Sequence, residues 1–229
     1  MKMLEQFHLT LKRLNIAFAA TDRYKPVSQP SKNRWKGIQS YLPERQKEFF
    51  TARWCAGKCL NMLGLDGHPS ILTGKNGEPL WPEGVTGSIS HSKGAFCASA
   101  ALISNYSSLG IDIESIGNKI SDDAFRLIVN NDETDWMSRI HDNIDFFKLI
   151  VFSAKESLFK LLFPLVKKRF YFNAVSIFPV PSRRQGNLTA VLNESLHPDY
   201  RKGQHFEGNY FSDKKWLLTA FYIKNNSAL

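Results

Sequence analysis

Alternating apolar and polar positions in the middle of the chain predict a strand that carries two acidic side chains. The segment 109–115, LGIDIES, is an apolar run with two carboxylates spaced two residues apart. Because side chains alternate across a strand, Asp112 and Glu114 share one face, while Ile111 and Ile113 share the other. We therefore expect the isoleucines to anchor the strand in a core and the carboxylates to point together at whatever lies opposite.

A long helix is predicted over 145–163, where polar residues recur at helical intervals in an apolar segment and Pro164 follows. Phe152, Glu156 and Lys160 are spaced by four residues, so they lie along one side of this helix. Charged groups in so apolar a helix are costly to bury unless they have partners. Taken alone, the helix is better explained by an ordinary surface pair between Glu156 and Lys160.

Together the two segments offer carboxylates for a metal ion and ammonium groups for phosphate. Asp112, Glu114 and Glu156 are hard oxygen ligands of the kind that suits Mg²⁺ or Mn²⁺. Lys160, and Lys155 beside the same helix face, could neutralise phosphate charge. This combination suits phosphoryl-group chemistry. The plain alternative is a solvated edge strand next to an unremarkable helix.

The rest of the pattern mixes helices and strands in both halves, which predicts the α+β class without fixing a topology. We expect a loop over 24–42, a helix from Pro43 to Gly64, turns from Pro69 to Pro82, a β-hairpin over 88–102, short helices around 122–138, and strands at 172–178, 188–193 and 215–223.

Composition is that of a globular chain. With 229 residues, 43% of them hydrophobic, the protein can bury a sizeable core. No stretch approaches the roughly 20 apolar residues of a membrane span, and the first residues lack the apolar region of a signal peptide. The three cysteines are odd in number and suit a reducing compartment, so we expect a cytoplasmic protein.

The net charge of +9 is unevenly distributed. Residues 1–60 contain twelve Lys or Arg against four Asp or Glu, whereas residues 112–145 contain nine acidic and three basic residues. A basic first quarter favours a polyanionic partner, although a solvated basic face is the commoner cause of such runs. No RNA-binding motif, zinc finger or Walker loop is present, so we expect no nucleic-acid partner.

Two short polar groups in the first half could bind phosphate. Ser90 and His91 end a predicted strand where a turn begins, and Lys75 lies in a glycine-flanked loop. An imidazole and a hydroxyl beside exposed backbone N–H groups can hold an anion. Taken alone, such residues more often only face solvent.

Three blocks of this sequence, in order, resemble the paired signatures of the 4′-phosphopantetheinyl transferase family. They are GKNGEPLWPEGVTGSISHSKG at 74–94, GIDIE at 110–114 and FSAKESLFK at 152–160. The match is to the larger, two-lobed type that serves siderophore, nonribosomal-peptide and polyketide synthases, which includes the enterobactin-synthase component D group. The resemblance covers roughly residues 53–160.

The resemblance implies two similar α/β lobes, 1–108 and 109–229, related by pseudo-twofold symmetry with the active site in the cleft between them. It implies a monomer that moves the 4′-phosphopantetheine arm of coenzyme A to a serine of an acidic acyl or peptidyl carrier protein, releasing 3′,5′-ADP. The carrier supplies the nucleophile, and the basic first sixty residues would steer the acidic partner. No specific role is carried onto Lys32 or Lys36.

The family's functional residues map onto matching positions here. The resemblance implies that Asp112, Glu114 and Glu156 hold Mg²⁺, or Mn²⁺, and that Lys155 and Lys160 add positive charge near the diphosphate. Asp112, Glu156 and Lys160 would be catalytic, with Glu156 as the base that takes the serine proton. The 3′-phosphate end of coenzyme A would be held by Arg53, Lys75, Ser90 and His91.

Two other functions share some of these features. Another Mg²⁺-dependent enzyme acting on phosphates, such as a nuclease or phosphatase, would need the carboxylates. It would not need the SISHS block at 88–92 or the KESLFK segment at 155–160. A non-catalytic module that binds carrier proteins would not need three carboxylates.

Overall fold

The computed structural model describes residues 2–25, 40–66, 71–139, 143–180, 182 and 184–225. Lys32, Lys36 and most of the predicted loop at 24–42 lie outside the described residues. By its internal contacts the chain divides into two compact units. The first unit comprises Met1–Leu109 and Ile223–Leu229, and the second comprises Gly110–Tyr222.

The first unit packs helices against a small antiparallel sheet. Its elements are α1 (Lys2–Arg13), β1 (Ala17–Thr21), α2 (Pro43–Met62), β2 (Leu72–Thr73), β3 (Pro79–Leu80), β4 (Val85–Ser92) and β5 (Ala95–Leu102). The strands β1, β5 and β4 pair in that order, and β2 pairs with β3 in a separate hairpin. Gly94 takes φ +77° in the turn between β4 and β5.

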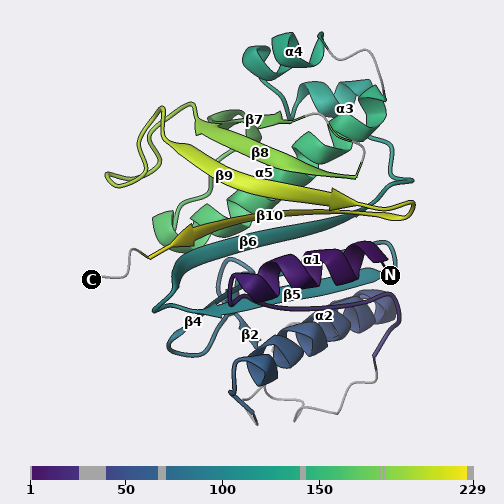
Figure 1. Ribbon diagram of the computed structural model, residues 1–229, viewed down its shortest axis with the longest axis vertical. Helices are drawn as coiled ribbons and strands as arrows, with labels where there is room; N and C mark the ends of the chain where they lie inside the picture. The colour runs from purple at the N-terminus through teal and green to yellow at the C-terminus, as the bar shows by residue number, and fades with distance from the viewer. Residues whose placement is uncertain are drawn as a thin grey trace. The chain divides into compact units, whose positions relative to one another are not determined.

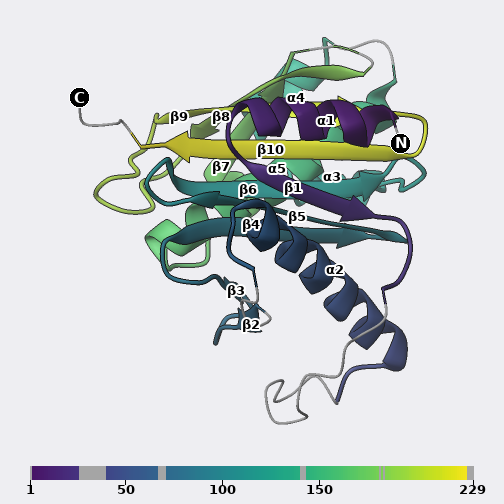
Figure 2. The ribbon, with the colours of Figure 1, turned by 60° about the horizontal axis from the view of Figure 1, so that its bottom comes forward.

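Helix α2 covers one face of this sheet (Figure 2). Proline at its first position supplies a helical φ and gives up an N–H that would have no partner there. Gly64, with φ +78°, ends it in a left-handed conformation that glycine adopts readily. The buried side of the helix is built from small side chains that pack against the alanine-rich β5: Thr51, Ala52, Cys55, Ala56, Cys59 and Leu60.

The second unit is built on a five-stranded sheet. Strand β6 (Tyr106–Ser115) begins in the first unit and enters the second at Gly110. It is followed by α3 (Asp122–Arg126), α4 (Asn131–Met137), α5 (Ile144–Val166), the 3-10 turn η2 (Phe172–Ala174), β7 (Val175–Pro179), β8 (Gln185–Leu192), β9 (His205–Ser212) and β10 (Trp216–Lys224). The strand order is β6, β10, β9, β8, β7, and α5 lies along one face of the sheet (Figure 1).

Gly110 allows α5 to approach β6 closely. A β-carbon added at this glycine would lie 2.0 Å from the carbonyl oxygen of Ser157 and 2.6 Å from the backbone nitrogen of Leu161. Both atoms belong to the helix backbone, which cannot move aside cheaply. The glycine before Asp112 is therefore required by packing, and it brings the carboxylate strand directly against the helix that carries Glu156.

Most of the predicted elements are confirmed, and the sheets and helices give the mixed α and β structure expected. The long helix was predicted to end at Pro164, which is wrong, because Pro164 lies inside its last turn and the helix ends at Val166. The pattern did not indicate α1, β1 or β9. The division at residues 108 and 109 and the pseudo-twofold relation stay predictions. Within the described residues, none of the helices has the length and apolar character needed to cross a membrane.

Candidate functional site

Asp112 is a buried member of the predicted site, and both of its oxygens are engaged. It lies on β6 with 4% of its surface exposed, between two buried isoleucines that anchor the strand. The hydroxyl of Ser153 donates to Oδ2 at 2.8 Å, and Nζ of Lys160 donates to Oδ1 at 2.7 Å. The structure thus brings Asp112 together with Ser153 and Lys160 of α5.

Glu114 and Glu156 lie near Asp112 but are less enclosed. Both are half-buried, and Oε2 of Glu114 accepts a hydrogen bond of 2.8 Å from Asn118. Burial raises the pKa of Glu156; Lys160 opposes the shift, while the charges of Asp112 and Glu114 add to it. The three carboxylates therefore act on one another electrostatically, which is a property of sites that take up a cation.

The chemistry of this donor set fits a hard divalent cation, since it offers carboxylate oxygens from two adjacent elements. Among the described residues, however, no three side chains of His, Cys, Asp or Glu are arranged closely enough to hold a metal ion. The oxygens of Asp112 are directed to Ser153 and Lys160, and Glu114 is turned to Asn118. Binding a cation would require the longer glutamate side chains to rotate.

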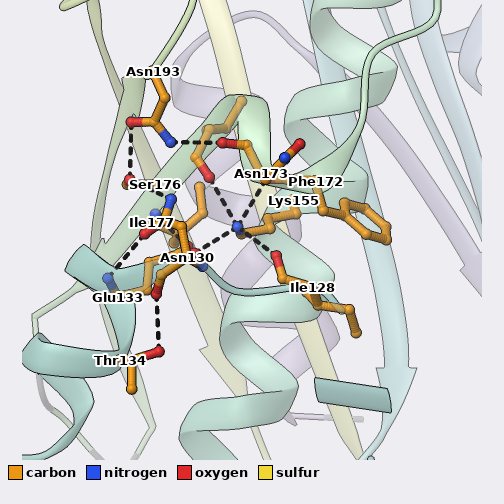
Figure 3. Close-up of polar contacts among 11 residues, drawn as sticks. Ile128, Asn130, Glu133, Thr134, Lys155, Phe172, Asn173, Ser176, Ile177 and Asn193 are labelled. Atoms are coloured by element: carbon orange, nitrogen blue, oxygen red, sulfur yellow. Dashed lines mark hydrogen bonds and ion pairs between the residues drawn. The ribbon is translucent and has the colours of Figure 1, made fainter. Parts of the chain in front are cut away.

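Lys155 does not lie with the other predicted phosphate-binding groups, and this prediction is corrected. Its side chain is 1% exposed and ion-pairs with Glu133 at 2.6 Å. Its ammonium group also lies 2.8–2.9 Å from the carbonyl oxygens of Ile128, Phe172 and Val175 (Figure 3). An ammonium group has three donors, so these four acceptors use all of them. Lys155 therefore cannot contact coenzyme A in this arrangement.

Glu133, the partner of Lys155, ties three elements together. One of its oxygens accepts from the backbone N–H of Ile177 on β7, and the other accepts from the N–H of Asn130 in a capping box at the start of α4. Burial raises the pKa of Glu133 and lowers that of Lys155, and the ion pair opposes both shifts. The pair joins α4, α5 and β7 in the interior of the unit (Figure 3).

In the first unit, His91 meets an arginine that the sequence analysis did not single out. Nη1 of Arg45, on α2, lies 2.7 Å from Nε2 of His91 at the end of β4. Because a guanidinium can only donate, Nε2 of His91 accepts in this contact. The two residues are 46 positions apart, so only the packing of α2 on the sheet reveals the pair. Ser90, beside them on β4, is buried.

Arg53 is held against the β2–β3 hairpin that carries Lys75. Its Nε donates to the carbonyl of Ile71 at 2.9 Å, its Nη2 donates to the hydroxyl of Thr73 at 2.7 Å, and its guanidinium lies 3.3 Å from the centre of the Phe49 ring. Burial lowers the pKa of Arg53 to about 9, so the group remains cationic at neutral pH. Lys75 is exposed in the turn of that hairpin.

Two family models match consecutive parts of the chain. Residues 35–101 match the 4′-phosphopantetheinyl transferase N-terminal domain, and residues 108–218 match the 4′-phosphopantetheinyl transferase superfamily. The second match contains Asp112, Glu114, Glu156 and Lys160, and the first contains Arg45, Arg53, Lys75, Ser90 and His91.

Similar proteins cover most of the same residues. The chain is 32% identical over 202 residues to the 4′-phosphopantetheinyl transferase Svp of Streptomyces mobaraensis, which covers 86% of this chain and 80% of that protein. It is 32% identical over 157 residues to the 4′-phosphopantetheinyl transferase PptT of Mycobacterium tuberculosis, covering 67% of each chain. It is 33% identical over 125 residues to enterobactin synthase component D of Salmonella typhi, covering 54% of this chain and 50% of that protein.

Proposed function

Because the chain belongs to the 4′-phosphopantetheinyl transferase superfamily, we propose that its two units divide the work of moving the phosphopantetheine arm of coenzyme A onto a carrier-protein serine. The protein is a transferase whose co-substrate is coenzyme A and whose acceptor is a carrier protein. The observation that carries the assignment of residues is the meeting of Asp112 on β6 with Lys160 on α5, next to Glu114 and Glu156.

The reaction is a phosphoryl transfer. The serine oxygen forms a bond to the phosphorus that bears the pantetheine. The bond from that phosphorus to the bridging oxygen of the diphosphate breaks, and 3′,5′-ADP leaves with the electron pair. The serine proton must pass to a base. Catalysis then consists mainly of holding the diphosphate in line and balancing its charge.

Residues of the second unit would perform these tasks. Asp112, Glu114 and Glu156 would hold Mg²⁺, which supplies charge neutralisation at the diphosphate and at the leaving oxygen when it is bound. Lys160, with a quarter of its side chain exposed, would offer its ammonium group to the same oxygens. Glu156 would accept the serine proton, since it is a half-buried carboxylate on the same side of α5 as Lys160.

Residues of the first unit would bind the adenosine 3′-phosphate. His91 and Arg45 already meet at the end of β4, and Ser90 precedes His91 on that strand. Arg53 would act through its hold on the β2–β3 hairpin, which presents Lys75 to an anion. These side chains supply charge-assisted donors, the type of group that recognises a phosphate most strongly.

The natural acceptor would be an acidic acyl or peptidyl carrier protein. A relative is named as a component of enterobactin synthase, so carriers of siderophore and other nonribosomal-peptide synthases are the first to try. The basic residues of the first sixty positions would speed encounter with such a carrier more than they would tighten the final complex. The reduced state of Cys55, Cys59 and Cys97, none of which is in a disulfide, supports the expected cytoplasmic location.

Mass spectrometry tests the proposed function. An apo carrier protein is incubated with this protein, coenzyme A and Mg²⁺, and its mass should increase by one phosphopantetheine arm. A variant carrier whose acceptor serine is alanine is the control and should gain nothing. An unmodified carrier together with degraded nucleic acid, or with phosphate released from coenzyme A, would favour the nuclease or phosphatase alternative instead.

A further inference from the structure

Three buried hydroxyl groups form a connected chain that ends on Asp112. Ser153 and Ser157 lie four residues apart on the same face of α5, and Thr219 lies opposite them on β10; all three have no exposed surface. The hydroxyl oxygens of Ser153 and Thr219 are 2.9 Å apart, and those of Thr219 and Ser157 are 2.6 Å apart. Ser153 reaches Oδ2 of Asp112 at 2.8 Å.

The carboxylate sets the direction of the first hydrogen bond in this chain. An ionised carboxylate only accepts, so Ser153 must give its single proton to Asp112. The hydroxyl of Thr219 lies 2.9 Å from both the hydroxyl oxygen and the backbone carbonyl oxygen of Ser153, and it donates to the carbonyl. The hydroxyl of Ser157 lies within reach of both the hydroxyl and the backbone carbonyl of Thr219. These contacts hold the turn of α5 that carries Ser153 against β10, and so they fix the position from which Ser153 donates to Asp112.

Packing alone does not explain hydroxyl groups at these positions. Ser157 lies at the close contact between α5 and β6 that Gly110 permits. A buried hydroxyl is costly unless it is hydrogen-bonded, and alanine or valine would fill this space without that requirement. At its end the arrangement fixes one oxygen of Asp112, while the other oxygen accepts from Lys160.

We propose that Ser153, Thr219 and Ser157 are positioning residues that hold Asp112 with Oδ2 directed into the protein, which leaves Oδ1, here bonded to Lys160, as the oxygen that a divalent cation would meet. The inference rests on the proposed function, since it takes Asp112 to be a metal ligand. Partners that orient a metal ligand in this way typically contribute 10–100-fold to metal affinity, roughly. Thr219 acts through Ser153, so its loss should cost about 10-fold, at the lower end of that range.

Two substitutions of Thr219 separate the hydroxyl from the volume it fills. Thr219→Val keeps the volume and removes the hydroxyl, whereas Thr219→Ser keeps the hydroxyl and removes a methyl group. Ser157 can still donate to the backbone carbonyl of residue 219, 3.1 Å away, so neither change leaves it without an acceptor. Electron paramagnetic resonance then measures free Mn²⁺ during titration of each protein, with and without coenzyme A.

The expected result is a Mn²⁺ dissociation constant about 10-fold higher for Thr219→Val and close to the wild-type value for Thr219→Ser. Ser176→Ala is the matched control. Ser176 is a buried hydroxyl of the same sheet that accepts from Asn130 and donates to Asn193, far along the strand order from β6. Its loss should lower the urea midpoint of unfolding and leave Mn²⁺ affinity unchanged.

Two outcomes overturn the inference while the transferase function stands. In one, Thr219→Val binds Mn²⁺ as tightly as wild type; in the other, the valine and serine variants weaken binding equally, so that volume rather than the hydroxyl matters. A wild-type protein that modifies the carrier without taking up Mn²⁺ or Mg²⁺ overturns the metal site and this inference with it. A wild-type protein that transfers no arm to any carrier overturns the proposed function itself.

Discussion

Replacing Lys155 should damage the fold, whereas replacing Lys160, five residues along the same helix, should damage the reaction. Lys155→Met leaves the carboxylate of Glu133 buried without its cation and removes the donor from three backbone carbonyls. Removing one member of a buried pair costs about 3–5 kcal/mol. That is a large part of the roughly 5–15 kcal/mol by which a domain is stable.

Lys160→Met should cost far less stability. Its side chain is a quarter exposed, and Asp112 keeps the hydrogen bond from Ser153. The loss of one partly exposed charge-assisted bond is worth about 1–2 kcal/mol. Transfer should nevertheless fall by at least about 100-fold, the effect expected when a preorganised donor to the reacting group is lost.

Urea unfolding followed by circular dichroism measures the first effect, and the rate of carrier modification by the folded fraction measures the second. With a urea slope of about 2 kcal/mol/M, the midpoint for Lys155→Met should fall by roughly 2 M. Adding Glu133→Gln to Lys155→Met should restore part of this loss, because a neutral amide replaces an unpaired buried charge. If Lys155→Met were as stable as wild type but did not bind coenzyme A, the reasoning would be refuted. Lys155 would then be a phosphate-binding residue of the site.

Three further predictions concern packing, thiols and the 3′-phosphate. Gly110→Ala should lower the free energy of unfolding by at least about 1–3 kcal/mol, since its β-carbon would strike the α5 backbone; Gly57→Ala, with no atom within 4 Å of the added carbon, should not lower it. Burial raises the pKa of Cys55 to about 12, so only about one thiol in ten thousand is ionised at pH 8. Ellman's reagent should therefore leave the native protein unlabelled at that pH and label it after unfolding in urea; rapid labelling of the native protein would contradict this. Calorimetry should show that wild type binds coenzyme A at least about 10-fold more tightly than it binds dephospho-coenzyme A. Arg45→Ala or His91→Ala should reduce this preference. An unchanged preference in either variant would show that the replaced residue does not contact the 3′-phosphate.

The sequence predicted the elements whose pattern is unambiguous. Strand β6 and helix α5 were expected because an apolar run with alternating carboxylates and an apolar helix with regularly spaced polar residues admit few other structures. Strand β9 was not indicated, since HFEGNYFS mixes polar residues with a glycine and has no continuous apolar face. Its place in the sheet is set by antiparallel pairing with β8 and β10, the strands that precede and follow it in the sequence.

The site was predictable only as far as its motifs reach. The two motifs predict that Asp112 and Lys160 belong to one site. The direction of the Lys155 side chain could not be predicted from its position next to Glu156 in the sequence. Neighbouring residues of a helix point about 100° apart, so one turns to the carboxylates while the other enters the core. Arg45 could not be linked to His91 without the packing of α2 on β4.

Measuring both products of one reaction tests the central claim, that this chain transfers a phosphopantetheine arm at the carboxylates around Asp112. Wild-type protein and folded Asp112→Asn are each incubated with coenzyme A, Mg²⁺ and an apo carrier protein. The 3′,5′-ADP released is counted by chromatography, and the modified carrier by mass spectrometry. We expect one 3′,5′-ADP for each modified carrier with wild type, and neither product above background with Asp112→Asn. Release of 3′,5′-ADP without carrier modification, or equal yields from the two proteins, would contradict the account.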